Sequence, residues 1–338
     1  MGRLNGGRQV RRRDVLGGGA AFGASGLFDL NAPAQAQGNY PSRPIRFIVP
    51  TAAGGAYDNV GRLLADRIGP ALGTMIVENR AGGNATIGVL AVAKSLPDGY
   101  TVLLGSNSTH IFQPTMMRSA PYDPVKDFVP IATLAASWTC FAVSPSLGIT
   151  TLKELVDYAR ANPGKLTHAI RGIGDVSHMA GELFKQLTGK PDIINVPYSA
   201  MATAVKDLMS GDLNMTLPLT TAALVELHNA GKIRLLAINS PKRLSIAPTI
   251  PTAVEAGIPD MLAAEYFYLF APAGTPVPIL QRFNDEISVA MENKEFRDRL
   301  TQAGFDPSFV GGLRESQAQF EKERARWVPI AQATGLKN

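Results

Sequence analysis

The chain has 338 residues, of which 45% are hydrophobic and 18% charged, and its formal charge is +5 at pH 7. One cysteine excludes an intramolecular disulfide, and four scattered histidines show no metal-ligand spacing, so we expect no metal site. A chain of this length usually forms two domains. Cys140 lies in an apolar run, residues 138–143, which favours a buried structural thiol.

Residues 1–36 have the features of an export signal. Arg11 to Arg13 precede a short, weakly apolar run, residues 17–30, and Ala34-Gln35-Ala36 has the small-x-small form of a signal-peptidase site. The run is rich in glycine and shorter than the roughly 20 apolar residues of a spanning helix, which favours a twin-arginine-type signal over a membrane anchor or a disordered basic arm. We therefore expect a periplasmic protein whose signal is removed near Ala36.

Removal of this signal lowers the formal charge of the chain. It leaves 28 basic and 26 acidic residues, a formal charge of +2. The remaining sequence has no basic stripe with interleaved aromatic residues, so we expect no nucleic-acid partner.

The chain after the signal begins with alternating strands and helices. The hydrophobic pattern predicts strands at residues 45–49, 75–78 and 101–104, and helices at residues 59–69 and 87–95. This order predicts a parallel, doubly wound α/β sheet.

A second alternating set follows from residue 152. It predicts helices at residues 152–161, 176–187, 202–209 and 221–230, and strands at residues 166–170, 193–196, 213–217 and 233–239. Thr150 or Thr151 with Glu154 resembles a capping box at the start of the first of these helices.

Two extended runs, residues 139–143 and 265–270, are interpreted as strands that cross between two lobes. Lobe 1 would comprise residues 40–139 and 269–338, and lobe 2 residues 140–268. Residues 279–291 and 314–331 have the periodicity of amphipathic helices, which we expect to pack on lobe 1.

Each set contains a glycine-bearing loop between a strand and a helix. The first is Thr51 to Asp58, with Gly54 and Gly55, and the second is Arg171 to His178. The N-terminus of a helix offers unpaired backbone N–H groups and the positive end of the helix dipole. Such loops suit a carboxylate or a phosphate, and both could face one ligand.

Seven segments occur in an order typical of one family. They are Tyr40-Pro-Ser-Arg-Pro-Ile45, Gly54-Gly-Ala-Tyr-Asp58, Val77-Glu-Asn-Arg80, Pro97-Asp-Gly-Tyr-Thr101, Pro121-Tyr-Asp-Pro-Val-Lys-Asp-Phe128, Val196-Pro-Tyr198 and Leu269-Phe-Ala-Pro-Ala-Gly-Thr-Pro276. With them, the whole chain after the signal resembles the periplasmic solute-binding proteins of tripartite tricarboxylate transporters, the Bug-type receptors. The resemblance implies a two-lobed periplasmic-binding-protein fold (type II), and a monomer that captures a small carboxylate and presents it to the permease subunits of a membrane transporter. It implies binding without turnover and without a cofactor.

The resemblance maps the ligand site onto the two loops and onto the polar segment that follows the third strand. The candidate ligand-binding residues are Thr51, Gly54, Gly55, Ala56, Tyr57, Asp58, Ser106, Asn107, Ser108, Thr109, Arg171, Gly172, Gly174, Asp175, Val176, Ser177, His178 and Tyr198. Residues 198–202 and 217–219 are less polar than the corresponding family segments, which predicts an apolar far wall.

Several candidates have alternative roles. Tyr57 replaces the family's small hydroxyl residue and either stacks on a planar ligand or covers the loop. Asp58 either caps the first helix or contacts ligand. Thr51 stands where an aromatic residue is common, which indicates a different cleft shape. We expect His178 to make a structural hydrogen bond.

Asp175 stands where the family usually has serine or threonine, and an unpaired negative charge there would repel a carboxylate. Asp175 therefore either caps the helix that begins at Val176 and pairs with Arg171, or contacts an amine or hydroxyl of the ligand. Arg171 could instead clamp a second ligand carboxylate. The ligand is accordingly expected to be an aromatic or dicarboxylic acid, with an amino or hydroxy acid left open.

Three other functions are alternatives to this interpretation. Gly172-Ile-Gly-Asp-Val-Ser177 is a near miss to the GxGxxG pattern of an exported oxidoreductase, because serine replaces the third glycine. A hydrolase would need a nucleophile elbow, and no GxSxG occurs. A solute-sensing receptor for a signalling partner stays open, because closure on a ligand would serve both roles.

Overall fold

The computed structural model describes residues 40–308 and 311–335. The predicted export signal lies outside the described residues. The predicted strands and helices are present, with ends that move by up to three residues. The structure adds strand β4 (Phe128–Trp138) and helix α9 (Lys294–Gln302), which were not predicted, together with three short helical segments given below.

The sheet of lobe 1 has five strands in the order β2-β1-β3-β10-β4. They are β1 (Ile45–Val49), β2 (Met75–Asn79), β3 (Thr101–Ser106), β4 and β10 (Ala264–Pro272). Strand β1 pairs in parallel with β2 and β3, whereas β10 runs antiparallel to β3 and β4. The predicted parallel order is confirmed for β1, β2 and β3. The antiparallel pairs are added by β10, which returns from lobe 2 and enters the sheet in the opposite direction.

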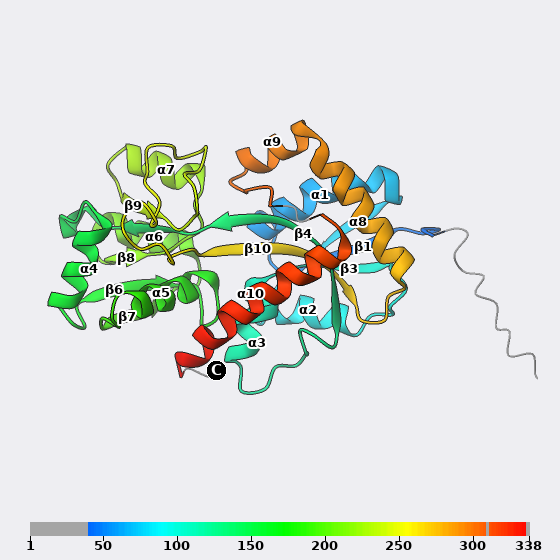
Figure 1. Ribbon diagram of the computed structural model, residues 1–338, viewed down its shortest axis with the longest axis horizontal. Helices are drawn as coiled ribbons and strands as arrows, with labels where there is room; N and C mark the ends of the chain where they lie inside the picture. The colour runs from blue at the N-terminus through cyan, green and yellow to red at the C-terminus, as the bar shows by residue number, and fades with distance from the viewer. Residues whose placement is uncertain (1–39, 309–310, 336–338) are drawn as a thin grey trace, which may run out of the picture. The chain divides into compact units, whose positions relative to one another are not determined.

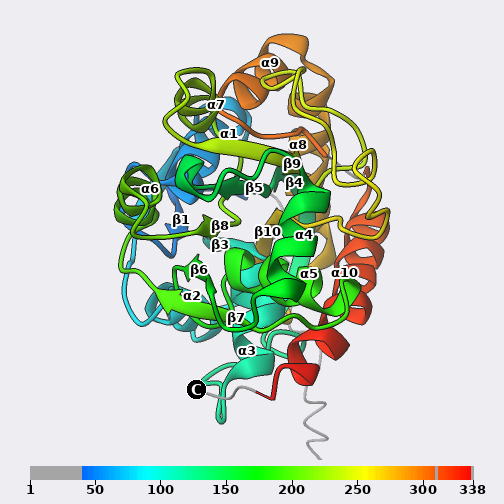
Figure 2. The ribbon, with the colours of Figure 1, turned by 90° about the vertical axis from the view of Figure 1, so that its left-hand side faces the viewer.

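Lobe 2 repeats this arrangement with a sheet in the order β7-β6-β8-β5-β9. The strands are β5 (Cys140–Val143), β6 (Leu166–Ile170), β7 (Ile193–Pro197), β8 (Met215–Thr216) and β9 (Arg234–Ile238). Strand β6 is parallel to β7 and β8, and β5 is antiparallel to β8 and β9. Figure 2 views this lobe from its own end, with helices on both faces of the sheet.

The helices follow the strands in chain order. Lobe 1 has α1 (Ala56–Leu72), α2 (Thr86–Ala93), a short π-helical turn η1 (Ser108–Phe112), α3 (Gln113–Met116), α8 (Val277–Glu292), α9 and α10 (Leu313–Ala333). Lobe 2 has the 3₁₀ turn η2 (Pro145–Leu147), α4 (Leu152–Ala161), α5 (Val176–Leu187), α6 (Met201–Ser210) and α7 (Ala222–Asn229). The capping box of α4 is confirmed, and Thr151 is its N-cap.

Two long strands connect the lobes. Strands β4 and β10 pair from Phe128 with Pro272 to Trp138 with Ala264, and β4 continues through Thr139 into β5 of the other sheet. Figure 1 shows β4 and β10 side by side, extending from the sheet of lobe 1 toward lobe 2. The interpretation of residues 139–143 and 265–270 as crossing strands therefore omitted β4, the longer part of the first connection. The predicted lobe limits at residues 140 and 268 stay a prediction.

The C-terminal helices pack largely as expected. Helix α8 contacts α1 and β4, and α10 contacts β4 and η1. Helix α10 also contacts α5 of lobe 2, so it does not pack on lobe 1 alone. Cys140 is buried as expected, and burial raises the pKa of its thiol to about 12. No described helix combines the length and the apolar character needed to cross a bilayer.

Candidate functional site

The first loop connects β1 to α1 and leaves the start of this helix open. Gly55 is the N-cap of α1 and provides no side-chain cap, so the first-turn N–H groups stay available. Gly54 has a φ of 84°, which favours glycine. Gly55 has a φ of −89°, and a Cβ there would meet nothing nearer than the Ala52 oxygen at 3.8 Å. Neither backbone conformation nor packing requires glycine at position 55, and its missing side chain keeps the loop surface accessible.

Asp58 holds this loop in place. Its Oδ2 accepts hydrogen bonds from the Gly54 N–H at 2.9 Å and from Arg62 Nε at 3.0 Å, and its Oδ1 accepts one from Asn79 Nδ2 at 2.9 Å. Burial opposes ionisation of Asp58, but these hydrogen bonds outweigh it and lower its pKa to about 2. The carboxylate is thus committed to protein donors on α1, β2 and the loop.

Tyr57 turns into lobe 1 and joins a buried polar cluster. Its hydroxyl donates to Glu265 Oε1 at 2.7 Å and is hydrogen-bonded to Ser106 Oγ. Ser108 Oγ donates to Glu265 Oε2 at 2.8 Å. The Tyr57 ring also packs edge-on against Phe267, with centroids 5.0 Å apart. Of the two roles expected for Tyr57, this geometry corresponds to covering the loop rather than to an open stacking face.

The second loop connects β6 to α5. Asp175 is the N-cap of α5 and accepts a hydrogen bond from the His178 N–H at 2.8 Å, and its Oδ2 lies 3.7 Å from Arg171 Nε. Capping and pairing with Arg171 are thus both present. Burial raises the pKa of Asp175, and the Arg171 charge opposes that rise. His178 Nδ1 accepts from the Gly174 N–H at 3.2 Å, the structural hydrogen bond that was expected.

The second loop lies close to lobe 1. The Arg171 guanidinium of lobe 2 is close enough to lobe 1 for its charge to lower the pKa values of Glu265 and Tyr57, although burial raises both overall. A Cβ at Gly174 would lie 3.1 Å from the Cα of Gln113, and the φ of Gly174 is 78°. Glycine at this position therefore permits both the turn and the close approach to lobe 1.

A cavity of about 420 Å³ lies beside the second loop. It is formed by the start of α5, the first turns of α6 and the segment from β8 into α7. It is lined by Arg171, Asp175, Val176, Ser177, Met201, Ala202, Val205, Pro218, Leu219, Thr221, Ala223, Leu224 and Leu227. Nine of these thirteen side chains are apolar, in agreement with the expected apolar wall around residues 198–202 and 217–219.

Three predicted site residues use their polar atoms in hydrogen bonds within the protein. Asn107 Nδ2 donates to Glu323 Oε2 of α10 at 3.1 Å. Thr109 Oγ1 accepts from the backbone N–H three residues earlier at 2.9 Å. The Tyr198 hydroxyl donates to Asp207 Oδ2 at 2.7 Å, which raises the pKa of Tyr198 to about 12. These residues support the loops around the site.

The remaining predicted residues lie on the loops themselves. Thr51 has a buried Oγ1 without a hydrogen-bond partner in the described part of the chain. Ala56 is the first residue of α1. Gly172 lies opposite Asn84 of lobe 1, whose Nδ2 would be 3.8 Å from a Cβ at position 172.

Glu265 is the residue that sequence reasoning missed. It is 1% exposed and lies on β10 within the polar cluster of Tyr57 and Ser108. The available signal was a single carboxylate in the aromatic, apolar run of residues 265–270. A buried acid in such a strand requires hydrogen-bond donors from neighbouring elements.

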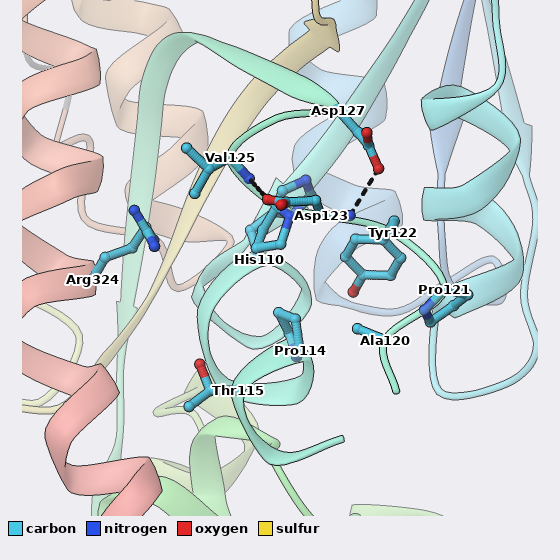
Figure 3. A pocket seen from close by; sticks show the side chains of 11 residues that line it. His110, Pro114, Thr115, Ala120, Pro121, Tyr122, Asp123, Val125, Asp127 and Arg324 are labelled. Carbon is cyan, nitrogen blue, oxygen red and sulfur yellow. Dashed lines mark hydrogen bonds between the residues drawn. The ribbon is translucent and has the colours of Figure 1, made fainter. Parts of the chain in front are cut away.

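A second cavity, of about 520 Å³, lies away from both loops. Figure 3 shows Arg324 of α10 on one side of it and the segment with Asp123 and Asp127 on the other. Arg324 pairs with Glu321 at 2.8 Å, and Asp127 Oδ2 accepts from the Asp123 N–H at 2.7 Å. No cluster of three or more His, Cys, Asp or Glu side chains suited to a metal ion occurs within residues 40–308 and 311–335. Of these two cavities, the one beside the second loop is lined by residues of a candidate loop.

Comparison with known proteins identifies the family. Residues 60–336 match the Tripartite tricarboxylate transporter family receptor. The chain is 33% identical over 310 residues to BugT of Bordetella pertussis, covering 91% of this chain and 94% of BugT. A solved R. palustris protein with adipate is 32% identical, with a TM-score of 0.78 over 88% of this chain and 99% of that protein. MatC from Rhodopseudomonas palustris with bound malate is 29% identical, with a TM-score of 0.75 over 86% and 100% of the two chains. The chain belongs to the receptor family of the tripartite tricarboxylate transporters.

Proposed function

We propose that the protein is a periplasmic receptor that captures a small carboxylate between its two lobes and delivers it to the permease of a tripartite tricarboxylate transporter. The observation that carries this proposal is that two loops lie at helix N-termini, and that the second loop approaches lobe 1 with Arg171 close enough to act on Tyr57 of the first loop. Open N–H groups, a helix dipole and a guanidinium all favour an anion. The relatives solved with adipate and with malate support the same chemical class.

We propose capture without turnover, and the engagement of the reactive groups supports it. His178 is fully buried, and its Nδ1 accepts a hydrogen bond from the Gly174 N–H. Asp58 and Asp175 accept hydrogen bonds from their own loops or helices. Charge-assisted hydrogen bonds of about 1.5–3 kcal/mol each are sufficient for micromolar binding when a few act together.

The site residues are proposed from this geometry. Ligand would contact the open backbone around Gly54 and Gly55, the Arg171 guanidinium, and the N-terminal turns of α1 and α5. The polar cluster of Tyr57, Ser106 and Ser108 would form the floor on lobe 1. We propose a monomer, since one chain supplies both loops.

Thermal unfolding in the presence of small carboxylic acids tests the function. A ligand at 100 times its dissociation constant stabilises the folded protein by about 2.7 kcal/mol, which raises the melting temperature by several degrees. The expected result is such a shift with at least one carboxylate, after mass spectrometry has excluded a co-purified ligand. A shift with a nucleotide cofactor and with none of the acids would overturn the proposal in favour of the exported oxidoreductase.

A further inference from the structure

The cavity beside the second loop has a polar rim and an apolar interior. Three of its four polar side chains already have partners in the protein. Asp175 accepts from the His178 N–H at 2.8 Å, Thr221 Oγ1 accepts from the Leu224 N–H at 3.3 Å, and Ser177 Oγ donates to the Ala169 carbonyl at 3.1 Å. Of these three side chains, only Thr221 keeps a donor, its own hydroxyl proton, because its Oγ1 accepts in the printed hydrogen bond.

Arg171 is the fourth polar side chain, and it lies on the solvent side of the cavity. Its side chain is 42% exposed, and its Nε is 3.7 Å from Asp175 Oδ2, longer than a hydrogen bond. The donors of its guanidinium can therefore reach a carboxylate at the rim. One carboxylate of the ligand has a cationic partner there.

A second carboxylate would meet opposing groups on either side. Toward lobe 2 it would enter a space lined by Val176, Met201, Val205, Leu219, Leu224 and Leu227. An ionised group there is disfavoured, because the Thr221 hydroxyl is the single uncharged side-chain donor in the lining that is not already used. Toward lobe 1 it would approach Glu265, whose two oxygens already accept hydrogen bonds from Tyr57 and Ser108. Two carboxylates, Asp175 and Glu265, already accompany the single guanidinium.

We propose that the ligand is a monocarboxylate whose carboxyl group binds at Arg171 and whose aliphatic or aromatic tail enters the lobe 2 cavity. This inference rests on the proposed function. It keeps the aromatic acids expected from the sequence, adds aliphatic ones and excludes the dicarboxylic acids. A cavity of about 420 Å³ is within the range of small-molecule sites, which begins near 300 Å³. Di- and tricarboxylates are then poor ligands of this member of the family.

Calorimetric titration of the whole protein with matched acids tests the charge preference. Hexanoate and adipate have six carbons each and differ by a terminal carboxylate in place of a methyl group. We expect hexanoate to bind at least about tenfold more tightly than adipate. Along the series from propionate to hexanoate, we expect affinity to rise about fourfold with each methylene, because each one leaves water for the cavity.

Two adjacent alanines at the start of α7 provide a matched pair of variants. Both are exposed, but only Ala223 lines the cavity. Ala223→Trp fills the cavity and should remove the dependence on chain length. Ala222→Trp adds the same side chain outside the cavity and should keep that dependence.

The possible outcomes separate this inference from the proposed function. Tighter binding of hexanoate, with a chain-length dependence lost in A223W and kept in A222W, supports the inference. Equal or tighter binding of adipate, or a chain-length dependence that persists in A223W, overturns the inference while carboxylate capture stands. If no acid of either kind binds, the proposed function itself fails.

Discussion

The two lobes present different chemistry to one site although their sheets have the same arrangement of strands. On lobe 1, Tyr57, Ser106, Ser108 and Glu265 are hydrogen-bonded to each other, and each is at most 5% exposed. On lobe 2, the side chain of Arg171 is 42% exposed beside a mostly apolar cavity. Strand order places both loops, and the side chains on each loop decide what that loop can bind.

This contrast assigns different tasks to the two lobes. A satisfied, buried network on lobe 1 fixes the position of its loop, since moving any member would leave a buried polar group without a partner. On lobe 2, the exposed guanidinium and the cavity can still contact a ligand. We infer that lobe 1 provides a preformed backbone surface and that lobe 2 determines which acid is selected.

The largest expected effect comes from closing the backbone surface of lobe 1. Gly55→Val places a branched side chain where neither conformation nor packing restricts it, so the fold should tolerate the change. We expect carboxylate affinity to fall by about 100-fold or more, because the backbone can no longer approach the ligand. Calorimetry measures the affinity, and an unchanged melting temperature verifies the fold. Retention of full affinity in G55V would remove the first loop from the site.

The next effect tests the charge on lobe 2. Arg171→Ala removes the guanidinium, and the loss of a charge-assisted hydrogen bond costs about 1.5–3 kcal/mol, or about 10- to 150-fold in affinity. Arg171→Lys should recover part of this loss, because an ammonium lacks the planar fork of the guanidinium. Arg299→Ala, an exposed arginine on α9, is the matched control. Equal affinity of R171A and R299A would contradict the assigned role.

A smaller effect tests the network on lobe 1. Tyr57→Phe removes the donor to Glu265 Oε1, and a buried carboxylate that loses a hydrogen bond should lower the free energy of unfolding by about 1–3 kcal/mol. In the background of Glu265→Gln, Tyr57→Phe should lower the free energy of unfolding by less, because the amide at position 265 is neutral. Urea unfolding of the single and double variants gives this coupling energy. Additive costs would show that Tyr57 and Glu265 do not act as a unit.

The fold could be predicted where local pattern determines structure. Strand β1, and helices α4 and α5, have the predicted ends, because alternating or helical periodicity stops there at turn or capping residues. Strand β4 was missed because it is buried along most of its length and so lacks an alternating pattern. The direction of β10 depends on its return from lobe 2, which is a long-range property that local sequence does not encode.

The site could be predicted only in part for a related reason. Loops at helix N-termini can be located from glycines that follow a strand, as at Gly54 and Gly174. The hydrogen-bond partner of Tyr57 could not be located from local sequence, because Glu265 lies 208 positions away in the chain. The pairing of Asp175 with Arg171 was predictable, because the two residues are four positions apart on one loop.

The pH dependence of stability isolates Glu265 within the lobe 1 network. Burial raises the pKa of Glu265 above that of the unfolded chain, although hydrogen bonds from Ser106, Tyr57 and Ser108 oppose this. The folded state then binds more protons than the unfolded state. The contribution of Glu265 to the free energy of unfolding is therefore complete below about pH 4.3 and is lost as pH rises through its folded pKa. Glu265→Gln cannot titrate, and its stability should fall less between pH 4 and neutral pH. Parallel profiles of the two proteins in urea unfolding would contradict this.

The smallest effect separates the two contacts of Asp175 on lobe 2. Asp175→Ala removes the cap of α5 and should lower the free energy of unfolding by about 0.5–2 kcal/mol. Asp175→Asn keeps an N-cap of similar quality but removes the negative charge 3.7 Å from Arg171. Because the guanidinium charge is then no longer offset, D175N should bind a monocarboxylate several-fold more tightly, while its stability stays close to that of the unmodified protein. Tighter binding in D175N shows that Asp175 limits the affinity of lobe 2 for anions. Weaker binding in D175N would instead mean that Asp175 contacts an amine or hydroxyl of the ligand, and the lobe 2 face would then have to be assigned to an amino or hydroxy acid.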